Sequence, residues 1–330
     1  MRKIKAAQIG INQYSHSNEI WGSITKQKDV FEVVGYVLPE NEKERIPHKY
    51  EDIKEYRQLS LDEVLNNPEI EAVTIETDEI YLTKYALMAA KAGKHIHMEK
   101  PGGTNLCDFE ELVSVMRKSG RVFHIGYMYR YNPFIHDLIE KVKRGELGDI
   151  ISVEAQMNCT HPNHHRQWLN ELPDGMMFYL GCHLIDLVLQ IQGNPKNIIP
   201  YNKCTGKDGI ISKDFGMAIF EYDNGVSFVK TTDCEIGGFN RRQLVVTGTK
   251  GTVELKPLER YVNSDLLCTD RTQCLLTESN PTEHDQSEPI NRYDHMMKSF
   301  AEYVCGKKQN PYSLDYELEL YKTLLKACGK

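Results

Sequence analysis

The sequence of 330 residues contains no apolar run near the roughly 20 residues that a membrane-spanning helix needs. It also has no basic run, because its 40 lysines and arginines are interleaved with 47 aspartates and glutamates, for a formal net charge of −7. The first residues, MRKIKAAQIG, lead into a short strand-like run and not into a secretory apolar segment. We therefore expect no membrane association, no nucleic-acid partner and no secretion.

Paired cysteine motifs are absent as well. The nine cysteines are odd in number, and no two of them are spaced as C-x-x-C. This pattern argues against a disulfide framework and against a thiolate zinc site. We expect free thiols in a reducing, cytoplasmic setting and no bound metal.

Residues 1–124 alternate short apolar runs with helical segments. Strands are predicted at 5–10, 31–38, 72–77, 95–99 and 122–127. Helices are predicted at 15–28, from the S-x-x-E capping pattern that begins at Ser60, and before the terminating glycines Gly93 and Gly120. This alternation predicts a first domain of βαβ units around a doubly wound parallel sheet, the Rossmann arrangement.

Residues 125–330 have longer strand-like runs. These are expected at 151–158, 216–232, 242–255 and 265–278, with hairpin turns at DNG (223–225) and GTKG (248–251). Helices are expected at 133–144, near 175–192 and within 292–328. The pattern predicts an α+β domain with an open, mostly antiparallel sheet, and the C-terminal helices at 292–328 are candidates to pack back on the first domain.

The stretch GINQYS follows the first predicted strand, where a dinucleotide fold carries G-x-G-x-x-G. Gly10 is in place, but Asn12 and Ser15 replace the second and third glycines. A pyrophosphate can still bind the helix N-terminus through this loop, with contacts from Ile11, Asn12 and Gln13. An ordinary β–α turn without a cofactor is the alternative interpretation.

The second predicted strand ends VLPEN, where an acid commonly binds the ribose hydroxyls. Leu38 takes the acidic position and Glu40 comes two residues later. No arginine stands there to accept a 2′-phosphate. Glu40 therefore weakly favours NAD over NADP.

Lys100 ends the strand in HIHMEKPGG and directly precedes Pro101. A residue before proline is restricted to extended conformations. Parallel sheets bind ligands outside the carboxyl ends of their strands, so Lys100 lies in a functional zone. The alternative is a surface lysine without a chemical role.

Five stretches in order carry a family resemblance: GKHIHMEKPGG (93–103), GYMYRYNP (126–133), RGELGDI (144–150), GMMFYLGCHLIDLVLQIQG (175–193) and VTGTKGTVEL (246–255). Together they resemble the Gfo/Idh/MocA oxidoreductases, a family of glucose–fructose oxidoreductase, inositol dehydrogenase and relatives. The resemblance implies an NAD- or NADP-binding Rossmann domain followed by an open-sheet domain. It also implies a homodimer or homotetramer formed through that sheet.

The resemblance assigns Lys100 of E-K-P and His183 of G-x-H-x-x-D to the reacting carbon. Glu99 and the retained Thr77, in TDEIYL, are expected to line the cofactor. Tyr179 stands where many family members carry an aspartate. We expect His183 to be the general base with Lys100 stabilising the substrate oxygen, or Lys100 to be the base if it is desolvated.

Tyr179, His183 and Asp186 fall on one face of a regular helix. On that face Asp186 can fix the tautomer of His183, or it can pair elsewhere. Tyr179 is expected to orient the substrate or relay a proton. A buried core histidine is the alternative for His183.

The loop HPNHHRQW (161–168) is expected to bind substrate through His165, Arg166 and Trp168, or else to be a solvated loop. Its imidazoles lack the H-E-x-x-H spacing of a zinc site. Tyr129 and Arg130, in MYRYNP, are further substrate candidates, although Arg130 can equally pair with an acid such as Glu99.

These expectations converge on hydride transfer between a nicotinamide cofactor and a carbinol of a sugar, inositol or related polyol. Two alternatives stay open. One is an NAD-assisted glycosidase or eliminase in which the substrate is oxidised only transiently. The other is a non-catalytic ligand sensor that keeps the fold, which the altered GINQYS loop favours.

Overall fold

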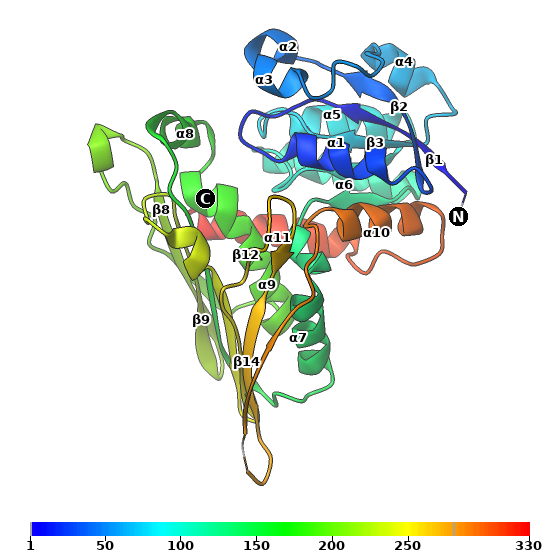
Figure 1. Cartoon of the computed structure of the whole chain (residues 1–330). Helices are drawn as coiled ribbons and strands as arrows, with labels where there is room; N and C mark the ends of the chain where they lie inside the picture. Colours follow the sequence, from blue (N-terminus) through cyan, green and yellow to red (C-terminus); the bar gives the residue numbers. More distant parts are fainter. Residues whose placement is uncertain (1, 280) are drawn as a thin grey trace. The chain divides into compact units, whose positions relative to one another are not determined.

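The computed structural model describes residues 2–279 and 281–330, and the chain forms two compact units (Figure 1). The first unit comprises Met1–Tyr127 and Tyr293–Tyr321. The second comprises Met128–Arg292 and Lys322–Lys330. Each unit has its own sheet and its own buried core.

The first unit is built on a five-stranded parallel sheet with the strand order β2-β1-β3-β4-β5. Its elements are β1 (Ile4–Ile9), α1 (Ser17–Lys26), β2 (Phe31–Val37), α2 (Glu42–Arg45), α3 (Pro47–Tyr50), α4 (Leu61–Asn66), β3 (Ala72–Ile75), α5 (Leu82–Lys91), β4 (His95–Met98), α6 (Leu106–Ser119), β5 (Phe123–Ile125), α10 (Asp294–Val304) and the first part of α11 (Leu314–Ala327). The predicted doubly wound parallel sheet is confirmed.

Local sequence explains the elements of this unit. All residues of β3 and β4 are buried, as expected of central strands covered on both faces. Ser60 and Glu63 form the reciprocal capping box at the start of α4, and Gly120 ends α6 in the left-handed conformation. The strand order reverses between β1 and β3, and this topological switch point is where open α/β sheets bind ligands.

Helices from the end of the chain complete the first unit. Helix α10 lies beside α1, and Ser23 Oγ donates a 2.9 Å hydrogen bond to Asp294 (Figure 1). The Tyr321 hydroxyl donates to the carbonyl of Gly103, and its ring stacks on Phe109. Residues 293–321 therefore share the core of the first unit.

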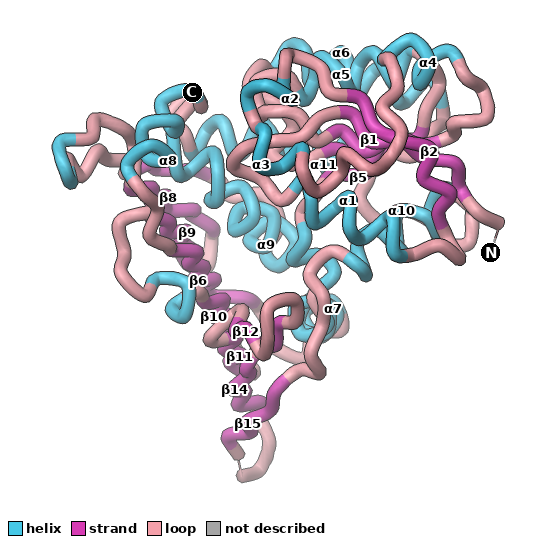
Figure 2. Tube along the Cα trace, turned by 45° about the horizontal axis from the view of Figure 1, so that its top comes forward, coloured by secondary structure: helices cyan, strands magenta, loops and turns pink. Residues whose placement is uncertain are grey.

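The second unit is built on an eight-stranded sheet with the order β15-β14-β11-β10-β6-β9-β8-β7 (Figure 2). Its strands are β6 (Ile150–Asn158), β7 (Asn197–Pro200), β8 (Phe215–Tyr222), β9 (Gly225–Thr232), β10 (Gln243–Gly248), β11 (Gly251–Leu255), β14 (Asp270–Leu275) and β15 (Thr282–Gln286), and β12 (Arg260–Tyr261) pairs separately with β13 (Leu267–Cys268). Strands β6 and β9 pair in parallel, and every other pair is antiparallel. The predicted open, mostly antiparallel sheet is confirmed.

The helical elements of the second unit are η1 (Met128–Tyr131), α7 (Pro133–Lys143), α8 (Asn163–Trp168), η2 (Leu169–Glu171), η3 (Met177–Gly181), α9 (Cys182–Gln192), η4 (Lys207–Gly209) and η5 (Gly238–Arg241). Helix α9 packs on β6 and is buried along almost its whole length. Val153 and Ala155 of β6 are buried, whereas the alternating residues Ser152 and Glu154 are half-buried on the opposite face. This alternation leaves one face of the sheet more open than the other.

Two features differ from the sequence-based expectation. The edge strands β7 and β15 were not expected, because their sequences NIIP and TEHDQ lack a clear apolar alternation. The segment near 175–192 is not one regular helix, since η3 is a π-helical turn that precedes α9. In the part of the chain that the structure describes, no helix is both long and apolar enough to cross a membrane.

Candidate active site

The carboxyl end of the parallel sheet in the first unit holds three buried carboxyl groups. Glu76 directly follows β3, Glu79 lies three residues later, and Glu99 directly follows β4. Their exposed fractions are 0%, 1% and 5%. Because the strands are parallel, their carboxyl ends lie on the same side of the sheet, and these acids meet there although they are up to 23 positions apart in sequence.

The loop after β1 approaches this edge closely. Gly10 has a φ of +93°, and a Cβ there would lie 2.7 Å from the backbone nitrogen of Thr77. Any other residue at position 10 would therefore be strained and would collide with the loop after β3. The requirement for glycine agrees with the predicted dinucleotide loop.

Asn12 is fully buried and joins the loop to its neighbours. Its Oδ1 accepts hydrogen bonds from the backbone N–H groups of Tyr14 and Ser15. Its Nδ2 donates to the Thr77 carbonyl at 3.1 Å and to Glu79 Oε2 at 3.0 Å. Thus the residue that replaces the second glycine organises the loop with its own side chain.

Two residues of the segment after β2 also reach the loop. Glu42 is fully buried, and its Oε2 accepts a 3.1 Å hydrogen bond from the backbone N–H of Ile11. Lys49, from α3, donates to the carbonyl of Ser15. A carboxyl group and an ammonium group of the same segment therefore contact the loop after β1.

Burial controls the protonation of the acids. It raises the pKa of Glu42 to about 9 and the pKa of Glu99 to about 7, with the Lys100 charge opposing the rise at Glu99. Burial also raises the pKa of Glu79, again against the charge of Lys100. The pKa of Glu76 lies well above its usual range because of burial and the charge of Glu99.

Lys100 stands within this group. It is 5% exposed, and its Nζ lies 3.7 Å from Glu99 Oε1. Beneath the acids, His97 Nε2 lies 3.5 Å from Glu76 Oε1, and the Nδ1 atoms of His97 and His124 are 2.6 Å apart. Lys100 is therefore a buried cation beside carboxyl groups, and not a solvated surface lysine.

The other residues expected to bind the cofactor, Thr77, Gln13 and Glu40, differ in burial and in their contacts. Thr77 is buried, and Gln13 is exposed at the tip of the loop. Glu40 Oε1 pairs with Lys84 at 2.5 Å and accepts a 2.6 Å hydrogen bond from the Tyr85 hydroxyl. Hydrogen bonds from Lys84 and Tyr85 hold the pKa of Glu40 below its usual range, so Glu40 is an ionised acid.

In the second unit, Tyr179 lies in the π-helical turn among aromatic rings. The ring centroids of Trp168 and His165 lie 5.1 and 5.5 Å from that of Tyr179, edge to face. His165 in turn stacks on His161, with centroids 3.7 Å apart. Segment 161–168 is not the solvated loop of the alternative expectation, because it forms α8 from Asn163 to Trp168 and buries His165 and Trp168. With the turn before α9 it forms one aromatic cluster: His161, His165, Trp168 and Tyr179.

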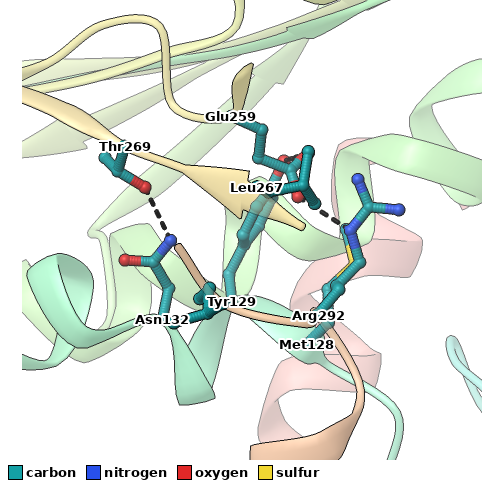
Figure 3. Close-up of a pocket in the computed structure, with 8 residues that line it drawn as sticks. Met128, Tyr129, Asn132, Glu259, Leu267, Thr269 and Arg292 are labelled. Atoms are coloured by element: carbon teal, nitrogen blue, oxygen red, sulfur yellow. Dashed lines mark hydrogen bonds and ion pairs between the residues drawn. The ribbon is translucent and has the colours of Figure 1, made fainter. Parts of the chain in front are cut away.

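His183, on α9, contacts a polar network through Tyr129. The two rings meet edge to face at 5.6 Å, and the Tyr129 hydroxyl donates to Glu259 Oε2 at 3.0 Å. Glu259 also accepts hydrogen bonds from Arg242 and Arg292, each at 2.8 Å. Figure 3 shows Tyr129, Glu259 and Arg292 together in the wall of a small pocket.

Asp186 is held by Arg130 in a buried, two-pronged ion pair. Arg130 Nε and Nη2 donate to the two carboxylate oxygens at 3.0 and 2.8 Å. Gln190 adds a 2.9 Å hydrogen bond to Oδ2. Of the two sequence-based interpretations of Arg130, the structure shows pairing with an acid, and that acid is Asp186.

Arg166, in α8, is fully buried. It donates to Asp214 Oδ2 at 2.8 Å and to Asp208 Oδ2 at 3.0 Å, and its Nε lies 3.8 Å from Asp233. Asp214, Asp233 and Cys234 are the one group of metal-capable side chains within residues 2–279 and 281–330. The guanidinium group already supplies a cation to these two aspartates.

Sequence reasoning missed Glu42, Lys49, Glu76 and Glu79 as members of the site. A signal was available for Glu76 and Glu79, because acids directly after a buried parallel strand must lie at its ligand-binding end. No local signal marks Glu42 or Lys49, since only the fold brings them to the loop.

Two family models match the chain. The model for the oxidoreductase family with an NAD-binding Rossmann fold covers residues 4–127, and the GFO/IDH/MocA C-terminal domain covers residues 135–254. Among curated proteins, the chain is 27% identical over 202 residues to trans-1,2-dihydrobenzene-1,2-diol dehydrogenase of Bos taurus, covering 59% of this chain and 58% of that protein. It is 24% identical over 200 residues to scyllo-inositol 2-dehydrogenase (NADP(+)) of Bacillus subtilis, covering 60% and 55%.

The match thus spans somewhat more than half the length of these two curated relatives. Among solved structures, aldose-aldose oxidoreductase from Caulobacter crescentus superposes with a TM-score of 0.79 at 20% identity, covering 99% of this chain and 98% of that chain. That likeness confirms the fold. With both of its domain models matched in order, this chain belongs to the Gfo/Idh/MocA oxidoreductase family.

Proposed function

We propose that the protein is an NAD(P)-dependent oxidoreductase that acts on a carbinol of a sugar, inositol or related polyol. The observation that carries the proposal is the buried Lys100, set beside Glu99 at the carboxyl end of β4 in a Rossmann-type unit. The two relatives described above are named for a ring diol and for an inositol, which supports a cyclic polyhydroxy substrate.

The first unit fits a dinucleotide cofactor. Gly10 allows the close backbone approach that a pyrophosphate requires, and Lys49 supplies a cation at the same loop. Gln13 is exposed at the loop tip, and the buried Ser15 Oγ has no hydrogen-bond partner there. We assign Gly10, Ile11, Asn12, Gln13, Thr77 and Glu99 to the cofactor site, together with Lys100.

NAD is favoured over NADP in this proposal. Glu40 follows β2, where the adenosine ribose of a dinucleotide lies in this fold, and its pKa lies below the usual range, so it is ionised. Acidic groups accept hydrogen bonds from two ribose hydroxyls but repel a 2′-phosphate. Glu40 does not stand at the position of the usual acid, so the preference rests on its charge alone.

The chain must remove a proton from the substrate oxygen, while the bound nicotinamide supplies the hydride acceptor. We assign proton removal to His183, whose ring is fixed against Tyr129. Lys100, as a cation, hydrogen-bonds the same oxygen and stabilises its developing charge. Tyr179 orients the substrate hydroxyls or relays the proton from the aromatic cluster.

Substrate recognition is assigned to the second unit. His165 and Trp168 offer ring faces and edges of the kind that pack on the apolar face of a sugar. Arg166, Arg130 and Asp186 are buried in ion pairs and position these rings and α9. Tyr129 positions His183 through its hydrogen bond to Glu259.

The test is a substrate panel of cyclic polyols and aldoses, scored by the absorbance of NADH or NADPH formed. Growth of that absorbance with one substrate class supports the proposal. Substrate conversion without accumulation of the reduced cofactor would instead indicate the transient oxidation of a glycosidase or eliminase.

One observation favours the non-catalytic sensor as a second candidate. Several N–H groups of the loop after β1 are satisfied by the chain itself, through Glu42, Ser17 and Asn12. Calorimetry with millimolar NAD(H) and NADP(H) separates the candidates. Binding of neither cofactor would exclude the oxidoreductase and leave the sensor.

We also propose a homodimer or homotetramer formed through the more open face of the eight-stranded sheet. Met217, Ile219, Phe228 and Val245 are half-buried apolar residues on that face. Light scattering after gel filtration measures the molar mass, and a monomer at micromolar concentration would contradict this proposal.

A further inference from the structure

Glu79 links the dinucleotide loop to the proposed reacting centre. Its Oε2 accepts the 3.0 Å hydrogen bond from Asn12, while its buried Oε1 has no hydrogen-bond partner. The charge of Lys100, which the proposed function places on the substrate oxygen, interacts with Glu79. Glu79 is 1% exposed, so its charge is not screened by water.

Carboxyl groups predominate in this buried group. Glu76 and Glu99 accompany Glu79, and both oxygens of Glu76 also lack hydrogen-bond partners. The charged or titratable groups that influence the three acids from the surrounding elements are Glu19 of α1, Lys49 of α3, Asp78 and Lys100, together with His97 of β4, which faces Glu76. Lys49 and Lys100 are the two lysines among these groups.

We propose that Glu79, together with Glu99, makes the site prefer the oxidised cofactor by stabilising the positive charge of the nicotinamide ring. This inference rests on the proposed function, since hydride transfer requires the ring to lie against a carbinol held by Lys100. The two carboxylates would attract the positively charged oxidised ring and would not attract the neutral reduced one. The acids then bias the enzyme toward oxidising its substrate and releasing the reduced cofactor.

The charge of Glu79 can be removed without removing its hydrogen bond. In Glu79→Gln the side-chain oxygen still accepts from Asn12, but the negative charge is gone. Glu79→Asp keeps the charge on a shorter side chain. Glu32→Gln, on the exposed side of β2 with a side chain 53% exposed, is the matched control for loss of one acid.

The experiment measures the dissociation constants of NAD+ and NADH by calorimetry at a pH near 8. The quantity compared is the dissociation constant of NADH divided by that of NAD+. An interaction of about 1.4 kcal/mol corresponds to a tenfold change in this ratio. We expect Glu79→Gln to lower the ratio about tenfold, whereas Glu32→Gln leaves it unchanged and Glu79→Asp stays close to the wild type. The pair NADP+ and NADPH is measured in the same way.

A second measurement needs only the unmodified protein. Burial raises the pKa of Glu99 to about 7, so its protonation removes charge as the pH is lowered from about 8 to about 5.5, and the wild-type ratio should fall over this range. If the ratio of dissociation constants is the same in Glu79→Gln and in the wild type and does not change with pH, the inference is wrong, although the proposed oxidoreductase function still stands. Failure of every nicotinamide cofactor to bind would overturn the proposed function itself.

Discussion

The guanidinium group of Arg130 holds both carboxylate oxygens of Asp186, at 3.0 and 2.8 Å, and each side chain is 1% exposed. Arg130 comes from the η1 turn and Asp186 from α9, three residues after His183. The pair therefore fixes the helix that carries the proposed base. Since it is buried, removal of one partner leaves an uncompensated charge.

Arg130→Met should lower the stability of the protein by about 3–5 kcal/mol, because Asp186 then remains buried without its cation. Thermal and denaturant unfolding, followed by circular dichroism, measure the loss. Arg260→Met is the control, since Arg260 forms a partly exposed pair with Asp270 at 3.5 Å, worth about 0–1 kcal/mol. The double variant Arg130→Met with Asp186→Leu should recover most of the stability; a single variant no worse than the control would contradict the prediction.

Lys100→Ala should abolish turnover far more than it weakens cofactor binding. A group that stabilises charge on the reacting oxygen contributes about 10²–10³ in rate, so kcat should fall by at least about 100-fold. The dissociation constant for NAD(H), measured by calorimetry, should change by less than about tenfold. Lys91→Ala, an exposed lysine of α5, serves as the control. Equal losses in cofactor affinity and turnover would show that Lys100 acts in binding alone.

Tyr179→Phe removes one hydroxyl and keeps the ring that packs between Trp168 and His165. We expect a fall in kcat of about tenfold or more with an unchanged melting temperature, because general acid–base partners contribute at least this much. Tyr261→Phe, at a residue 51% exposed, provides the matched loss of a hydroxyl. Full turnover in Tyr179→Phe would rule out both a relay and an orienting role.

Glu42→Gln should change how stability depends on pH. Burial raises the pKa of Glu42 from an ordinary 4.5 to about 9, so the folded chain keeps a proton that the unfolded chain releases. Its contribution is therefore present at low pH and is lost as the pH rises from 4.5 toward 9, by up to about 1.4 kcal/mol per unit.

Melting temperatures across this pH range check that sign. The wild type should lose stability faster than Glu42→Gln as the pH rises, because glutamine keeps an acceptor for the Ile11 N–H but cannot ionise. Glu32→Gln should follow the wild type. Parallel curves for the wild type and Glu42→Gln would contradict the raised pKa.

Much of the first unit could be predicted because its signals are local. The capping box at Ser60, the terminating Gly120 and the buried runs of β3 and β4 each depend on a few neighbouring residues. The hairpins at 223–225 and 248–251 also follow from local turn chemistry, and both are present. The π turn at Tyr179 could not be predicted, since packing and not propensity decides such an insertion.

The candidate site also combines features that depend on local sequence with features that depend on the tertiary structure. The sequence by itself determined that Lys100 ends a parallel strand and that Gly10 opens a nucleotide-type loop, because strand ends and tight turns are encoded by adjacent residues. Only the tertiary structure decided that Asn12 bonds Glu79, that Glu42 reaches Ile11 and that Arg130 pairs with Asp186. Those contacts join residues 31 to 67 positions apart, and the strand order and helix packing that bring such residues together leave no trace in local sequence.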